Sequence, residues 1–146
     1  QVDMPNLNPD DIVKLRDYLK DKKCHIGTLA SYLKDEEELK DRNVVKVITK
    51  KTIRNSDFSE ASDFTREETN SENKNIYHHI GIYGFTKEAL IRYVNLKRSK
   101  LEIERNLEQM RALEDKMKIH VGFTNSKPLS IDTEQDLLKI KKIMEG

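Results

Sequence analysis

Apolar residues in this chain of 146 residues change their spacing several times, from the alternation of a strand to the wider period of a helix. The strand-like stretches cover residues 26–32, 43–48, 76–85 and 119–123. Helix-like stretches lie before, between and after them. Such segments bury their apolar faces well as a sheet covered by helices, so the sequence predicts an α/β layered domain. No repeat or internal boundary is visible, and a single domain over residues 1–146 is expected.

The helix-like stretches begin with capping residues. Asn8 can cap a first helix and Pro9 suits its first position. Thr86 can cap a helix in the second half, and residues 101–113 are predicted to form one further helix. Asp132 or Thr133 is predicted to cap a last helix. The predicted apolar sides of these helices consist of Ile12, Leu15, Leu19, Leu90, Ile91, Val94, Ile103, Leu107, Met110, Leu137, Ile140 and Met144.

Two segments are dominated by polar residues. Residues 34–40 are strongly charged, which is typical of a short helix or a turn. Residues 50–74 are rich in Ser, Asp, Glu, Asn, Thr and Lys, with Phe58 and Phe64 as their main apolar side chains. This composition favours a solvated loop over a core element, and a loop is the prediction.

Composition excludes several classes of protein. Lys and Arg number 27 against 26 Asp and Glu, whereas a broad nucleic-acid-binding surface needs a basic excess. One cysteine, Cys24, cannot form an intrachain disulfide or a cysteine-based zinc site, and it fits the reducing cytoplasm. No run of apolar residues is long enough to span a membrane. We therefore expect a cytoplasmic protein that binds neither nucleic acid nor membrane.

Two acidic residues far apart in the sequence are candidates for a metal site. Asp3 and Asp132 each fall where a strand is predicted to pass into a helix. Carboxylates at such junctions are suitable ligands for Mg²⁺ in a phosphoryl-type transfer. Each residue also has a simpler explanation, Asp3 as a polar turn residue and Asp132 as a helix cap.

A third candidate lies on the strand over residues 76–85. His79, Gly81 and Tyr83 fall on one face by the period of two, and the glycine leaves bare backbone between an imidazole and a phenol. That arrangement suits a small polar ligand such as a sugar, although a half-exposed strand histidine explains it equally well. No glycine-rich phosphate loop and no nucleophile elbow is present.

The helix after residue 100 carries many charges. Glu102, Arg105 and Gln109 share one face by helical spacing, and Glu104, Glu108 and Arg111 share another. A solvated face of ion pairs is the simplest interpretation of both sets.

Five short motifs occur in one order along the chain. They are Gln1-Val2-Asp3-Met4-Pro5, Asn43-Val44-Val45-Lys46-Val47, His79-Ile80-Gly81-Ile82-Tyr83-Gly84, Leu107-Glu108-Gln109-Met110-Arg111 and Ile131-Asp132-Thr133-Glu134-Gln135-Asp136-Leu137. In this order and spacing they resemble the 3-deoxy-manno-octulosonate cytidylyltransferases (CMP-Kdo synthetases). The match begins in the middle of that family's pattern. The chain is therefore expected to be the C-terminal, sugar-binding and dimerisation portion of such an enzyme.

The resemblance implies a fold and a reaction. The fold would be a mixed-sheet nucleotidyltransferase, Rossmann-like and layered, here lacking its N-terminal part. The reaction would transfer CMP from CTP to Kdo with release of pyrophosphate, activating the sugar for lipopolysaccharide synthesis. The resemblance also implies Mg²⁺ and a homodimer. Without the base-binding half, the chain alone is expected to be inactive.

The resemblance also assigns roles to individual residues. Asp3 and Asp132 would be the catalytic metal ligands. The substrate-binding residues would be Gln1, Arg66, His79, Tyr83, Glu108 and Gln109. Val2 stands where the family usually has glycine, and Arg105 stands where a glutamate is common. These departures leave alternatives open: another sugar-acid cytidylyltransferase, resembling the CMP-sialate synthetases, or a non-catalytic remnant that forms dimers.

Overall fold

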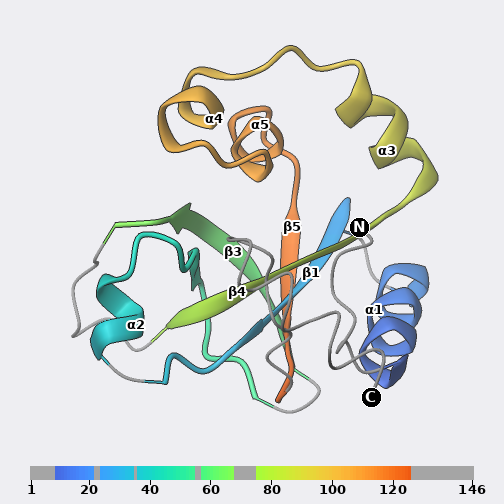
Figure 1. Cartoon of the computed structure of the whole chain (residues 1–146). Coiled ribbons are helices and arrows are strands. Elements are labelled where there is room, and N and C mark those ends of the chain that lie inside the picture. Colours follow the sequence, from blue (N-terminus) through green and yellow to red (C-terminus); the bar gives the residue numbers. More distant parts are fainter. Residues whose placement is uncertain (1–8, 22–23, 35, 55–56, 68–74, 126–146) are drawn as a thin grey trace, which may run out of the picture.

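The computed structural model describes residues 9–21, 24–34, 36–54, 57–67 and 75–125 (Figure 1). Within them are five helices, α1 (Pro9–Asp21), α2 (Glu36–Lys40), α3 (Lys87–Val94), α4 (Lys100–Arg105) and α5 (Gln109–Glu114). The strands are β1 (Ile26–Ser31), β2 (Lys46–Thr49), β3 (Phe58–Thr65), β4 (Ile76–Phe85) and β5 (Ile119–Phe123). Among the described residues, no helix has the length and apolar character needed to cross a membrane.

The described strands form one mixed sheet in the order β1-β4-β2-β3-β5, and the sheet closes because β5 pairs with both β3 and β1. The β1–β5 pair is parallel and the other neighbours are antiparallel. Figure 1 shows α4 and α5 together beyond one end of the strands, with α1 along the side. The mixed α/β class is confirmed. The described strands close into a barrel, so the sheet is not a flat open layer.

Helix α1 begins at Pro9 as predicted, and its contacts explain a glycine of the barrel. Leu15 is buried and packs where β1 and β4 approach the helix. A Cβ placed on Gly27 would lie only 2.7 Å from Leu15 Cδ1, so a larger residue there would force the Leu15 side chain to shift. Ile12, predicted to share the buried stripe, is instead exposed.

Strand β3 occupies part of the stretch predicted to be a solvated loop, and that prediction is wrong for Phe58–Thr65. The strand pairs with β2 on one side and with β5 on the other. Ala61 and Phe64 are buried, while the polar residues between them are more exposed. Pairing on both sides supplies the backbone hydrogen bonds, and this tertiary effect outweighs the polar composition.

The helix predicted over residues 101–113 is divided into α4 and α5. Asn106 ends α4 in the left-handed conformation, with φ 56°, which asparagine tolerates better than most residues. Leu107 and Met110 are buried as predicted, but Ile103 is 58% exposed. The apolar residues Leu90, Ile91 and Val94 of α3 are all exposed. The cap by Thr86 is confirmed, since its side chain accepts a hydrogen bond from Ala89 N.

The predicted solvated ion-pair face of α4 and α5 is also wrong at its centre. Glu102 is only 4% exposed, and it accepts two hydrogen bonds from Arg111, at 2.9 Å from Nε and 2.7 Å from Nη2. Ser99 and Glu102 form a reciprocal capping box at the start of α4. Hydrogen bonding from Arg111 lowers the pKa of Glu102, so the pair is ionised and fastens α4 to α5.

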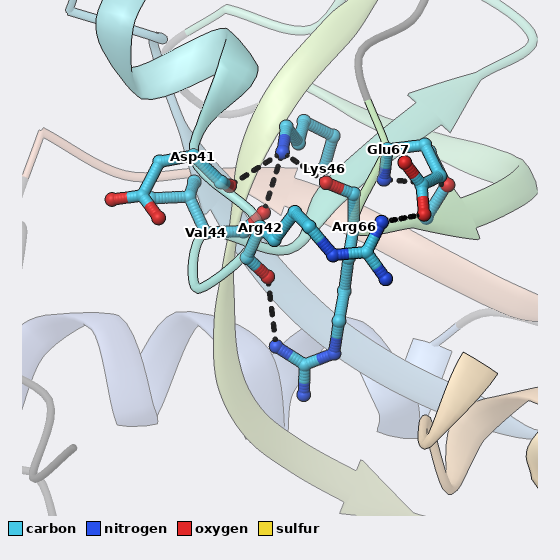
Figure 2. Close-up of polar contacts among 7 residues, drawn as sticks. Asp41, Arg42, Val44, Lys46, Arg66 and Glu67 are labelled. Carbon is cyan, nitrogen blue, oxygen red and sulfur yellow. Dashed lines mark hydrogen bonds and ion pairs between the residues drawn. The ribbon is translucent and has the colours of Figure 1, made fainter.

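A buried lysine joins two further segments of the chain. Lys46 is 0% exposed, and its Nζ donates to the carbonyl oxygens of Asp41, Val44 and Arg66 at 2.7, 2.9 and 2.6 Å (Figure 2). Three acceptors match the three donors of an ammonium group, so its charge is fully hydrogen-bonded. We call this arrangement the Lys46 clip. It joins the turn before β2 to the end of β3.

Candidate functional site

A pocket of about 250 Å³ lies where β4 meets the segment between α4 and α5. Its lining residues are Val45, Arg66, His79, Gly81, Tyr83, Asn106, Leu107, Glu108 and Gln109. Arg66 follows β3, His79 and Tyr83 lie on β4, and Glu108 and Gln109 lie at the start of α5. The structure therefore brings together five of the six predicted substrate-binding residues from three separate segments. Their roles toward a ligand stay predictions.

The shape of β4 at this pocket comes from an irregularity in its pairing with β1. Thr28 pairs with Tyr83, but the next residue, Leu29, pairs with Ile80, which leaves Gly81 and Ile82 outside the regular ladder. Such a bulge frees backbone groups and redirects the neighbouring side chains. The bulge lies between His79 and Tyr83, whose ring centroids are 5.5 Å apart.

His79 is fixed from several sides. It is 7% exposed, its Nε2 lies 2.9 Å from Thr28 Oγ1, and its ring meets Phe64 edge-on at 5.0 Å. Its backbone N donates to Val45 O at 2.8 Å. Burial, with a smaller effect of neighbouring His78, lowers the pKa of His79 from 6.5 to about 3. The imidazole is thus neutral at physiological pH and can exchange hydrogen bonds without adding charge.

Tyr83 lines the pocket and packs between two other aromatic rings. Its ring lies between those of His79 and Phe85, at centroid distances of 5.5 and 6.4 Å. Burial raises the pKa of Tyr83, with smaller contributions from Glu108 and Tyr93, so the phenol stays protonated. A protonated phenol can both donate and accept a hydrogen bond.

Arg66 provides the positive charge of the pocket. Its guanidinium donates to Arg42 O at 3.2 Å and to Asn106 O at 3.4 Å, which are long contacts for such a strong donor (Figure 2 draws the first). Its backbone carbonyl, by contrast, is held by the Lys46 clip. The main chain of Arg66 is therefore fixed, while the guanidinium keeps donor capacity for an anionic group.

Glu108 and Gln109 form the opposite wall. Glu108 is exposed at the pocket rim, and its carbonyl oxygen accepts a hydrogen bond from Tyr93 Oη at 3.1 Å. Gln109 is buried at the first position of α5. Arg111, two residues further, lies over the Tyr93 ring at 4.9 Å and also binds Glu102. These contacts set the position of the α5 start relative to β4.

Two larger pockets border the same strand but have mainly apolar walls. One, of about 360 Å³, lies under α3 and shares Tyr83, Glu108 and Gln109 with the polar pocket. The other, of about 380 Å³, lies between α1 and the end of β4. The smaller pocket is the candidate site, because a neutral imidazole, a guanidinium, a carboxylate and an amide converge on it.

The predicted metal ligands Asp3 and Asp132, and the predicted substrate residue Gln1, lie outside the described residues. Within the described part, no group of three metal-ligating side chains occurs. The described residues that border the two segments are in contact: Thr124 Oγ1 donates to Asp11 Oδ2 at 2.5 Å, and Lys14 Nζ donates to Phe123 O at 2.6 Å. The start of α1 and the end of β5 are thus neighbours.

Comparison with known proteins places this arrangement in a family. The family pattern described as "Cytidylyltransferase" matches residues 1–119, which is most of the chain. The chain belongs to the cytidylyltransferase family. The resemblance seen in its motifs is thereby confirmed at the level of the family.

Several members of the cytidylyltransferase family are similar along nearly the whole chain. The 3-deoxy-manno-octulosonate cytidylyltransferase of Bartonella tribocorum is 40% identical over 144 residues, which cover 99% of this chain and 58% of that protein. The protein of the same name from Rhodopseudomonas palustris (strain CGA009) is 39% identical over 146 residues, covering 100% and 59%. The chain thus spans somewhat more than half the length of these relatives.

Two solved structures have a similar fold. A CMP:2-keto-3-deoxy-manno-octonic acid synthetase complexed with CTP matches with a TM-score of 0.80 and 24% identity, over 98% of this chain and 58% of that one. UTP-bound UGPase from Acinetobacter baumannii matches with a TM-score of 0.60 and 10% identity, over 93% and 45%. At these identities the likeness concerns the fold.

Sequence reasoning missed two polar residues of the candidate site. Thr28 reaches His79 from the neighbouring strand, and Asn106 lines the pocket with its left-handed backbone. Threonine is common in strands, so the sequence around Thr28 did not indicate a role in the site. Asn106 was detectable in principle, because asparagine within a predicted helix is a frequent stop.

Proposed function

We propose that this chain supplies the sugar-acid site of an enzyme that transfers CMP from CTP to 3-deoxy-manno-octulosonate and releases pyrophosphate. The single observation that carries the proposal is the pocket of Arg66, His79, Tyr83, Glu108 and Gln109. These residues come from separate segments of the sequence, and the family resemblance assigns substrate binding to each of them. In the family that the motifs resemble, the corresponding residues bind the sugar.

The chemistry of the pocket matches a sugar that carries a carboxylate. Arg66 can bind a carboxylate by charge-assisted hydrogen bonds. Glu108 accepts hydrogen bonds from hydroxyl groups, and Gln109 can both donate and accept them. A neutral sugar would leave Arg66 unused, and a purely anionic ligand without hydroxyl groups would be repelled by Glu108. The combination therefore favours a polyhydroxy acid.

We propose Asp3 and Asp132 as ligands of Mg²⁺ in the same enzyme. Two carboxylates are suitable oxygen ligands for this cation. The contacts of Thr124 with Asp11 and of Lys14 with Phe123 support this, because they join the described ends of the two segments. When bound, Mg²⁺ would neutralise phosphate charge, while Arg66 and Glu108 would orient the sugar.

We further propose that the protein works as a homodimer in the cytoplasm, in lipopolysaccharide synthesis. The exposed apolar side chains of α3, namely Leu90, Ile91 and Val94, support a covered surface there. Val94→Lys should weaken self-association in sedimentation experiments, since a charge would be placed at 64% exposure in this face. An unchanged sedimentation coefficient would remove α3 from the interface.

Titration calorimetry of the chain with Kdo tests the sugar site. Glu108→Gln should weaken Kdo binding by roughly tenfold, because it removes a charged acceptor. Glu114→Gln, an exposed glutamate at the other end of α5, is the matched control and should bind normally. Sialic acid should bind less tightly than Kdo. Tighter binding of sialic acid would favour a CMP-sialate synthetase-like enzyme, and binding of neither sugar would favour a non-catalytic remnant.

A further inference from the structure

The hydroxyl group of Thr28 makes three close polar contacts inside the barrel. Thr28 is fully buried, and its Oγ1 lies 2.9 Å from His79 Nε2, 2.6 Å from Ile82 O and 3.2 Å from Ile80 O. The two carbonyl oxygens belong to the residues on either side of Gly81, at the bulge of β4. One side chain of β1 therefore touches both the bulge and the histidine of the candidate site.

The number of hydrogens settles the direction of these bonds. A hydroxyl group has one hydrogen to donate and can accept through its lone pairs. Ile82 O cannot donate, and two oxygens 2.6 Å apart without a hydrogen between them repel each other. The Thr28 hydrogen therefore points to Ile82 O. The contact with His79 must then be a bond that Nε2–H donates to Oγ1.

The other ring nitrogen of His79 is consequently an acceptor. A neutral imidazole with hydrogen on Nε2 carries a lone pair on Nδ1. Across the described residues, His79 Nδ1 has no hydrogen-bond partner. Among these residues, Ser31 Oγ is the only fully buried side-chain nitrogen or oxygen without a partner, so Nδ1 is not fully buried. Nδ1 therefore keeps some exposed surface, and the pocket with Arg66 and Gln109 is the one that His79 lines.

We propose that Thr28 is a positioning residue that holds His79 in the Nε2–H form, so that Nδ1 accepts a hydrogen bond from a ligand hydroxyl group. The ligand assignment rests on the proposed function, whereas the tautomer does not. His79 Nδ1 then binds a hydrogen-bond donor of the ligand, whereas the Arg66 guanidinium binds an acceptor. A polyhydroxy acid must enter with its carboxylate toward Arg66 and a hydroxyl toward His79, which fixes its orientation.

This arrangement also determines what the pocket rejects. A ligand that places a carboxylate or phosphate oxygen against Nδ1 would set two acceptors against each other, and an analogue lacking the hydroxyl would leave Nδ1 without a donor. Sites built to bind a hydroxyl reject analogues that lack it far better than apolar sites do. Thr28, which lies outside the lining of the pocket, would thus contribute to specificity through His79.

The experiment measures the tautomer of His79 by ¹⁵N NMR of the ligand-free chain and then the affinity for Kdo. In the unmodified chain, Nε2 should carry the hydrogen and Nδ1 should not. Thr28→Ser keeps the hydroxyl group and should preserve both the tautomer and the affinity. Thr28→Val removes it, and should give a changed tautomer population and a Kd for Kdo that rises by roughly tenfold.

Thr49→Val is the matched control, because Thr49 is also a buried strand threonine whose hydroxyl donates to a carbonyl, that of Lys51 at 2.6 Å. It should lower stability without altering the His79 spectrum or Kdo affinity. Hydrogen on Nδ1 in the unmodified chain, or an unchanged tautomer in Thr28→Val, would overturn the role of Thr28. If Thr28→Val is unfolded, a changed spectrum or affinity in Thr28→Ser would overturn it equally. The expected tautomer together with no Kdo binding by any variant would overturn the proposed function instead.

Discussion

The Lys46 clip and the candidate site both contain nitrogen groups that can form hydrogen bonds. The two regions differ in how completely these groups are hydrogen-bonded within the protein. In the clip, the ammonium group has three acceptors at 2.6 to 2.9 Å and no exposure to solvent. In the site, the Arg66 guanidinium reaches carbonyl oxygens only at 3.2 and 3.4 Å, and His79 Nδ1 has no partner among the described residues.

The two regions meet at one residue, since the carbonyl oxygen of Arg66 belongs to the clip and its guanidinium lines the pocket. A group that is fully hydrogen-bonded within the protein stabilises the fold and has nothing left for a ligand. A group that is incompletely bonded adds less stability but is available for binding. Loss of the clip should therefore lower the free energy of unfolding, whereas changes in the pocket should lower the affinity for a ligand.

The largest effect is expected for Lys46→Met. The variant keeps an apolar stem but leaves three carbonyl oxygens without their shared donor, and buried unpaired polar groups are costly. We expect the free energy of unfolding to fall by about 3 kcal/mol or more, measured by urea denaturation. A fall below about 1 kcal/mol would show that the clip is dispensable.

Arg66→Ala should show the opposite division of effects. Its long contacts contribute little to folding, so the urea midpoint should change only slightly, while the affinity for Kdo should fall by roughly 10- to 100-fold through loss of a charge-assisted contact. Titration calorimetry and denaturation of one preparation provide both values. Strong destabilisation with unchanged Kdo affinity would assign Arg66 to the fold and contradict the comparison.

Acid should destabilise the folded chain through His79. Because burial holds the pKa of His79 at about 3 instead of 6.5, the unfolded chain binds a proton below pH 6.5 that the folded chain does not bind until about pH 3. Stability from this residue is therefore complete above pH 6.5 and is lost as the pH falls, by at most about 1.4 kcal/mol per pH unit. His79→Gln should reduce the slope of unfolding free energy between these pH values. Equal slopes for the unmodified chain and the variant would contradict this effect of His79.

The smallest effect is expected for Lys50→Met, which serves as a control for the clip. Lys50 Nζ lies 3.1 Å from Glu60 Oε2, but its side chain is 58% exposed. Exposed ion pairs contribute roughly 0–1 kcal/mol, so the urea midpoint should hardly move. A loss as large as that of Lys46→Met would mean that burial is not what distinguishes the two lysines.

Local sequence patterns predicted the elements that carry their own signals. The strand at Ile76–Phe85 and the cap at Thr86 were correct because alternation and capping act over a few residues. Strand β3 could not be predicted in the same way, because its pairing with β2 and β5 depends on distant segments. The division of α4 from α5 had a local cause, Asn106, which periodicity alone concealed.

The residues of the candidate site that belong to family motifs could be predicted from the sequence. A residue that only supports another side chain of the protein could not. Arg66, His79 and Glu108 were expected from motifs, and the structure brings them to one pocket. Thr28 was not expected, because its importance arises from a register shift between β1 and β4. Such a shift depends on both strands together, and neither strand alone indicates it.

The closed order of the described strands has a consequence for behaviour in the cell. Each of β1 to β5 pairs with a strand on both sides over part of its length, so no described strand is a full-length edge to which another chain could add. Templated growth into fibres starts at such edges. The closed strand order therefore limits edge-to-edge aggregation, and slow amide exchange in the paired part of each strand would be its signature.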